Sequence, residues 1–189
     1  GVEVEIEPET GSLKICSYAL IDDCGVAINP SIVKGQVHGG IVQGAGQAMG
    51  ECAIFNVASG QLMNGSFMDY IMPRADEFPN FRVGTINVKT NENPLGVKAG
   101  GEAGTVPSLA LLGNAVMDAL SPLGVKHLDM PFTASKIWDA CPRSRSFFRP
   151  QNSDQGFFPA KKVVWWQAKV AGQGLRQQDQ VVVAAYPAT

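Results

Sequence analysis

The sequence is poor in the side chains that build metal clusters and nucleic-acid interfaces. Its four cysteines, at positions 16, 24, 52 and 141, form no Cys-x-x-Cys pair, which argues against a local zinc or iron–sulfur site. Only 17% of the residues are charged and the net charge is −2, so there is no basic footprint for nucleic acid. No apolar run is long enough to span a membrane and no signal-peptide pattern is present. We therefore expect no nucleic-acid partner, no membrane span and a reducing, cytoplasmic location.

Apolar residues, by contrast, make up 45% of the 189 residues, enough for one domain with a hydrophobic core. The chain starts at Gly1 directly on a strand-like pattern, so we expect it to be a fragment that begins inside a domain. Its composition changes near Cys141. Residues 1–140 hold 8 Lys+Arg and 15 Asp+Glu, whereas residues 141–189 hold 7 Lys+Arg and 2 Asp. The sequence thus predicts a domain over residues 1–140 and a poorly ordered tail over residues 141–189, with one possible strand at 179–185.

Periodicity within residues 1–140 predicts separate strands and helices. Apolar and acidic residues alternate over 2–6, and a second strand candidate covers 13–21, which together indicate a β-hairpin. Asn29 as N-cap and Pro30 at the first helical position favour a helix reaching Glu51. We expect an irregular segment over 52–80, a strand over 81–88, a core-facing helix over 107–120 and a short helix capped by Thr133. The predicted fold class is α+β, with a glycine-rich helix and a mixed sheet.

The helix predicted over residues 30–51 is unusual because it contains glycine at positions 35, 39, 40, 44, 46 and 50. Each interior glycine costs up to about 1 kcal/mol relative to alanine. Two explanations are open from the sequence: close approach of a bound ligand, or close packing of another backbone against the helix.

Glycines also surround one carboxylate, Glu102, just before the helix predicted over 107–120. Gly100, Gly101 and Gly104 are its small neighbours. Such a setting presents one acid to a bound cofactor or substrate, where it can accept a proton. A solvated glutamate on a flexible surface loop explains the same pattern equally well.

Three blocks, taken in order, carry a family resemblance: DDCGVAINP at 22–30, GQVHGGIVQGAGQA at 35–48 and NPLGVKAGGEAG at 93–104. They resemble the C-terminal part of the large subunit of the molybdenum hydroxylases, the family of xanthine dehydrogenase, aldehyde oxidase and aerobic carbon monoxide dehydrogenase. Asp69-Tyr70 with residues 72–74, and residues 124–131, look most like the carbon monoxide dehydrogenase-like branch. The resemblance covers about residues 1–140. It departs at Ala99, where the family commonly has glycine, and it does not extend to residues 141–189.

The resemblance implies that the chain belongs to a molybdenum-cofactor-binding domain. The cofactor would be a molybdenum–pterin, in the molybdopterin cytosine dinucleotide form, and the enzyme would oxidise carbon monoxide, an aldehyde or an N-heterocycle with water as oxygen source. By resemblance, Glu102 is the general base, and Gln43 contacts the cofactor with Gly44, Gly46 and Gly101 allowing close approach. No metal ligand is assigned to the chain itself. Iron–sulfur clusters and FAD would lie on partner subunits, in a dimer of heterotrimers.

Other polar residues suggest less. His38 is expected to be structural, Asp22 and Asp23 to form a turn or cap, and Lys98 either to contact a phosphate or to be solvated. The alternative to a catalytic fragment is an incomplete, non-catalytic module that cannot bind cofactor without the region upstream of it.

Overall fold

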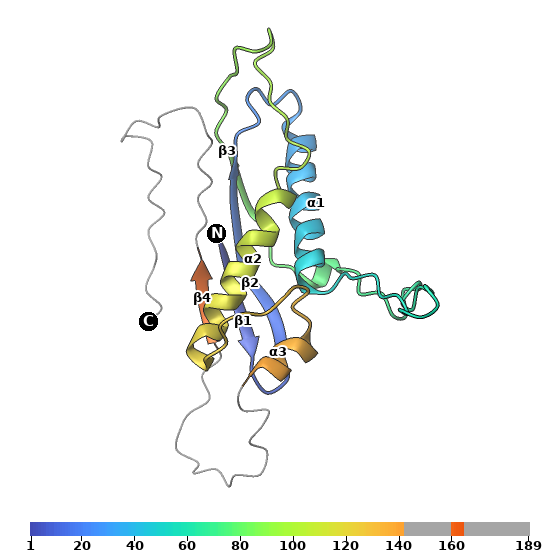
Figure 1. Ribbon diagram of the computed structural model, residues 1–189. Helices are drawn as coiled ribbons and strands as arrows, with labels where there is room; N and C mark the ends of the chain where they lie inside the picture. The colour runs from blue at the N-terminus through green and yellow to red at the C-terminus, as the bar shows by residue number, and fades with distance from the viewer. Residues whose placement is uncertain (142–159, 165–189) are drawn as a thin grey trace, which may run out of the picture.

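The computed structural model describes residues 1–141 and 160–164, in which a four-stranded sheet is covered by helices (Figure 1). The sheet has the strand order β3-β2-β1-β4. Strand β1 pairs antiparallel with β2 and with β4, whereas β3 runs parallel to β2, which confirms the predicted mixed sheet. The elements in chain order are β1 (Val2–Glu7), β2 (Ser12–Asp22), α1 (Pro30–Met49), the 3-10 turn η1 (Ala75–Glu77), β3 (Arg82–Thr85), α2 (Thr105–Leu120), the 3-10 turn η2 (Ser121–Leu123), α3 (Ala134–Ala140) and β4 (Ala160–Val164).

The β1–β2 hairpin follows the alternation in its sequence. Val2, Val4 and Ile6 are buried, while Glu3 and Glu5 between them are half-buried. The register is shifted once, between Glu3 and Val4, where a bulge interrupts the pairing with β2. The predicted hairpin is confirmed, with each strand slightly longer than the periodicity indicated.

The helix starts are also confirmed. Asn29 caps α1 because its side-chain oxygen accepts a hydrogen bond from the Ile32 amide at 3.2 Å, and Thr133 caps α3 in the same way through the Lys136 amide at 3.4 Å. Helix α1 ends at Met49 and Gly50 forms its C-cap, slightly before the predicted end.

Helix α2 lies on the sheet against β1 and β4 and packs along α1 (Figure 1). Its buried face includes Leu112, Val116 and Leu120, none of which is exposed to solvent. The segment Thr105–Leu123 is long and apolar enough to cross a membrane by length and composition alone. A single segment of this kind is weak evidence for a membrane span, because an apolar core helix passes the same test.

Two strands differ from the predictions. The strand expected over 81–88 stops at Thr85. The Ile86 amide still donates to the Asp22 carbonyl at 2.8 Å, but the Val88 amide donates to the side chain of Asp23, which ends the backbone pairing with β2. Strand β4, of 5 residues, pairs with β1 from within the segment expected to be a tail. Sequence periodicity did not indicate that strand, and the strand suggested at 179–185 lies outside the described residues.

Candidate functional site

Gln43 comes from α1 and Glu102 from the turn before α2, and both connect to Thr105, the first residue of α2. The Gln43 side-chain oxygen, on α1, accepts a hydrogen bond from the Thr105 hydroxyl at 3.3 Å. The amides of Thr105 and Val106 bond the Glu102 carbonyl at 3.0 and 3.2 Å, which closes the turn in front of α2. One hydrogen bond therefore links the predicted cofactor-contacting amide to the turn that presents the predicted base.

The turn is held against α1 by glycines on both sides. A Cβ atom on Gly104 would collide with the Val37 carbonyl and lie 2.8 Å from the Ile41 amide, both in α1. On α1, a Cβ on Gly44 would lie 2.7 Å from the Ser108 Cβ. Of the two explanations left open for the helix glycines, close packing of another backbone is what the structure shows at Gly44. A role for Gly44 in cofactor binding stays a prediction.

A chain of buried hydroxyl groups fixes the turn from the sheet side. The Ser108 hydroxyl donates to the Gly104 carbonyl at 2.6 Å, and the Tyr18 hydroxyl lies 2.7 Å from Ser108 Oγ. Since the single Ser108 proton is used toward Gly104, Tyr18 is the donor in the second bond. Burial raises the pKa of Tyr18, and the Ser108 contact opposes this rise. Strand β2, α2 and the Glu102 turn are thus connected through buried polar contacts.

The other two predicted cofactor-binding glycines have different surroundings. A Cβ on Gly46 would collide with the Glu51 carboxylate and with the Pro73 ring, so the chain itself fills that space. Gly101 is exposed, and apart from its two chain neighbours no described residue lies within 4 Å of where its Cβ would be. Open space for a ligand therefore exists beside Gly101, next to Glu102, and not at Gly46. Both assignments stay predictions.

Glu102 itself is exposed at the surface of the turn. Within residues 1–141, its carboxylate forms no hydrogen bond or ion pair, and the Gln43 side-chain nitrogen likewise donates none. The same part of the chain holds no group of three or more His, Cys, Asp or Glu residues that could bind a metal ion. The site thus offers one carboxylate and one amide donor, both on residues that are exposed to solvent.

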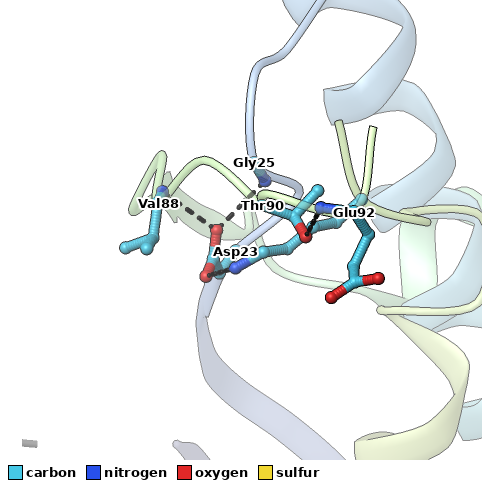
Figure 2. A network of polar contacts seen from close by, with 6 residues as sticks. Asp23, Gly25, Val88, Thr90 and Glu92 are labelled. Carbon is cyan, nitrogen blue, oxygen red and sulfur yellow. Dashed lines mark hydrogen bonds and ion pairs between the residues drawn. The ribbon is translucent and has the colours of Figure 1, made fainter. Parts of the chain in front are cut away.

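Asp23 organises the loop that leads to Glu102, a role that sequence reasoning described only as a turn or cap. Figure 2 shows the Asp23 carboxylate facing the amides of Gly25 and Val88, which donate to Oδ1 at 3.0 and 3.1 Å. Its other oxygen, Oδ2, pairs with the Lys98 ammonium at 2.6 Å. The same view shows Thr90 Oγ1 accepting the Glu92 amide at 3.2 Å. Lys98 is therefore held by Asp23.

The charge of Asp23 is stabilised by these contacts. Burial alone would raise the pKa of the Asp23 carboxyl, but the Lys98 ammonium and the two backbone amides outweigh it and hold the pKa below its ordinary value. In the sequence, Gly25 two residues after Asp23 is typical of an Asx turn, in which the aspartate side chain accepts the amide two residues later. The partner Lys98, 75 residues away, had no signal in the sequence.

Two polar atoms are buried without a hydrogen-bond partner in the described part of the chain, Asp22 Oδ2 and His38 Nε2. Burial raises the pKa of the Asp22 carboxyl. The His38 ring packs edge-on against Phe81, with centroids 5.4 Å apart. This packing agrees with the structural role expected for His38.

Comparison with known proteins places the fold and these residues in context. The family model of the molybdopterin cofactor-binding domain matches residues 1–79. The carbon monoxide dehydrogenase large chain of Hydrogenophaga pseudoflava is 38% identical over 135 residues, which cover 71% of this chain and 17% of that protein. The nicotine 6-hydroxylase large subunit of Paenarthrobacter nicotinovorans is 41% identical over 134 residues, covering 71% of this chain and 16% of the relative.

A solved structure of a further protein is similar to this chain in its fold as well as in its sequence. Quinoline 2-oxidoreductase from Pseudomonas putida 86 superposes with a TM-score of 0.70 and 34% sequence identity, over 73% of this chain and 17% of that one. The chain spans about one sixth of the length of the curated relatives it matches. The matched portion agrees with the extent of the resemblance predicted from the sequence.

Proposed function

We propose that this chain, which belongs to the molybdenum hydroxylase family as part of the large subunit, forms one wall of a molybdenum–pterin site and supplies its general base, Glu102. The observation that supports this proposal is the position of the Glu102 carboxylate. It is exposed and without a partner in residues 1–141, on a turn that Gln43 and Gly104 fix against α1. A solvated surface glutamate needs no such fixed turn.

The residues present fit a pterin cofactor in their donor set and in the space beside them. Gln43 keeps a free amide nitrogen, which can donate two hydrogen bonds to a pterin edge, while its oxygen is occupied by Thr105. Gly101 leaves open space beside Glu102. Gly44 and Gly46 would act indirectly, by letting α1 approach α2 and the Glu51 segment closely enough to orient Gln43.

The chemistry divides between the cofactor and the chain. When bound, the molybdenum–pterin supplies the two-electron oxidation of the substrate, with water as the oxygen source. Glu102 accepts a proton at its carboxylate, for which it must lie within hydrogen-bond reach of the donor. Gln43 orients the cofactor through its amide nitrogen. The Tyr18–Ser108–Gly104 hydrogen bonds hold the backbone of the turn that carries Glu102, which limits the positions that its carboxylate can reach.

The substrate and assembly are proposed from the relatives. The names of two of them include carbon monoxide and nicotine, so we propose a small substrate of the carbon monoxide, aldehyde or N-heterocycle class. We further propose the cytosine dinucleotide form of the cofactor, and partner subunits carrying FAD and iron–sulfur clusters in a cytoplasmic dimer of heterotrimers. A subunit named gamma in a related dehydrogenase complex supports the multi-subunit arrangement.

Substitution of Glu102 tests the base. In the complete enzyme that contains this chain, Glu102→Gln keeps the shape of the side chain but removes its capacity to accept a proton. We expect turnover to fall by about 10²–10⁴-fold, the range for loss of a general base, while molybdenum content per subunit is unchanged. Glu92→Gln, on the same exposed loop, is the matched control and should keep full turnover. Wild-type turnover in Glu102→Gln would refute the assignment.

A further inference from the structure

An exposed arm leaves the fold between α1 and η1. We define the apolar arm as residues 52–68; Figure 1 shows that it projects away from the sheet and from both long helices. Its sequence, CAIFNVASGQLMNGSFM, contains no Asp, Glu, Lys, Arg or His. A surface segment of this length without any charge is unusual, because solvated loops are normally rich in charged and polar side chains.

The backbone of the apolar arm is ordered by its own polar groups. Asn64, only 8% exposed, accepts the Ile54 amide at 2.8 Å and donates to the Cys52 carbonyl at 2.6 Å. The Met63 amide bonds the Ile54 carbonyl at 2.7 Å, and Phe55 bridges Leu62 across the arm. Since these polar groups are satisfied internally, the arm has a defined shape before it meets anything else.

The apolar side chains of the arm face outward. Val57 is fully exposed, Met68 is 91% exposed and Phe67 82% exposed. The other large apolar side chains exposed on the arm are Ile54, Phe55, Leu62 and Met63. Single exposed apolar residues are ordinary, but a set gathered on one uncharged projection marks a surface that is buried by a partner.

The base of the arm is fixed to α1, which sets the direction in which it projects. The Tyr70 hydroxyl donates to the Glu51 carboxylate at 2.7 Å, and Ile71 and Pro73 pack against Gly50 and Gly46. The base of the arm is therefore tied to the C-terminal end of α1.

The length of the relatives indicates which partner covers the apolar arm. The chain covers 17% of the carbon monoxide dehydrogenase large chain, so more than four-fifths of such a subunit lies outside it. An uncharged arm cannot select a partner by charge, so what it matches is an apolar groove. We propose that the apolar arm inserts into an apolar groove on the remainder of the large-subunit polypeptide and joins the two parts into one subunit. This proposal rests on the family membership and not on the role of Glu102.

Co-purification tests the proposal with the chain as it exists. The tagged 189-residue chain is co-expressed with the Hydrogenophaga pseudoflava carbon monoxide dehydrogenase large chain from which the matched segment has been removed, and the captured amount is measured. We expect capture by the wild-type chain, and at least a tenfold loss with the double variant Phe67→Ser, Met68→Ser. The matched control, Ile28→Ser with Leu95→Ser, changes two residues that are exposed outside the arm and should retain capture within twofold.

Methionine oxidation supplies a second measurement. Met68 should form its sulfoxide rapidly with dilute peroxide in the chain alone and at least tenfold more slowly in the captured complex. Capture without protection of Met68, unchanged capture by the arm variant, equal loss in the control variant, or no capture of the wild-type chain would each overturn the proposal. Light scattering gives one more contradicting outcome. If the wild-type chain self-associates and the arm variant is monomeric, a second copy of the chain occupies the arm, and the proposal is overturned. Glu102→Gln should leave capture unchanged, which separates this result from failure of the proposed base.

Discussion

At the scale of single residues, Asp23 shows how one carboxylate can position a loop. It joins the end of β2 to Val88 and to Lys98, four residues before Glu102. Both side chains of the ion pair keep about a third of their surface in water, 33% for Lys98 and 35% for Asp23. Pairs of this exposure contribute up to about 1 kcal/mol, so the value of Asp23 lies chiefly in holding the loop.

The pH dependence of this contact can be predicted in sign. Because the pKa of Asp23 is lower in the folded chain, the ionised carboxylate stabilises the fold above the ordinary pKa of aspartate, about 3.9. That stabilisation is lost as the pH falls through the lowered folded value. We expect Asp23→Asn to be less stable than wild type near pH 6, and the difference to shrink below about pH 4.

Urea denaturation between about pH 2 and pH 6 measures the effect. Asp139→Asn, which changes an exposed carboxylate on α3, is the control and should show little difference at any pH. A destabilisation by Asp23→Asn that is constant across the whole range would contradict the assignment of its charge.

How far the sequence predicts the site depends on the range of each interaction. Glu102 and Gln43 are predicted site residues because short glycine patterns surround each of them and because those patterns resemble motifs of the family; their roles stay predictions. The Asn29 cap was found because its signal lies within four residues. The contacts between Asp23 and Lys98, and between Tyr18 and Ser108, join residues far apart in the chain, so no local pattern contains both partners.

At the scale of elements, the contact between α1 and α2 depends on two classes of glycine. Gly40, Gly44 and Gly104 lie where the helices touch. Around Gly35 and Gly39, apart from their chain neighbours and the nearby backbone of α1, no described atom lies within 4 Å of a built Cβ. The first class is required by packing. The second weakens α1 without any compensating contact in the described part of the chain.

The two classes predict substitutions of opposite sign. Gly104 has helical dihedral angles, φ −77 and ψ −36, so alanine fits its backbone but not its space. Gly104→Ala should destabilise the chain by about 1–3 kcal/mol through overpacking against α1. Gly35→Ala should stabilise it by up to about 1 kcal/mol, because open space receives the methyl group. Both are read from urea denaturation midpoints, and equal effects of the two changes would contradict the packing.

The elements themselves were predictable where their signals are local. The hairpin, both capped helices and α2 follow from periodicity and capping residues. Strand β3 is shorter than its apolar run because Asp23 captures the Val88 amide, and β4 was missed because its five residues gain their role only by pairing with β1. Long-range pairing decides both cases.

At the scale of the whole molecule, we expect other polypeptide to complete the proposed site. Gln43, Gly101 and Glu102 are all exposed here. A cofactor that contacts only these residues would be held by few hydrogen bonds in water, each worth about 1 kcal/mol net. We therefore expect the purified 189-residue chain, expressed in a host that makes the cofactor, to contain no molybdenum.

Elemental analysis of the purified chain by mass spectrometry, with a dye-reduction assay beside it, checks this prediction. A complete large subunit from a relative, purified from the same host, is the control for cofactor supply. Stoichiometric molybdenum together with dye reduction by the isolated chain would show that the site is complete without further polypeptide.

The place of β1 in the sheet has a consequence for synthesis. Strand β1 lies between β2, its neighbour in sequence, and β4, which follows more than 150 residues later. At ribosomal rates of about 5–20 residues per second, β2 is complete about 1–3 seconds after β1, whereas β4 is complete only about 8–30 seconds after it. Closure of such a distant pair is also slow for entropic reasons. During translation, the inner strand of the finished sheet therefore spends most of its time as an edge strand.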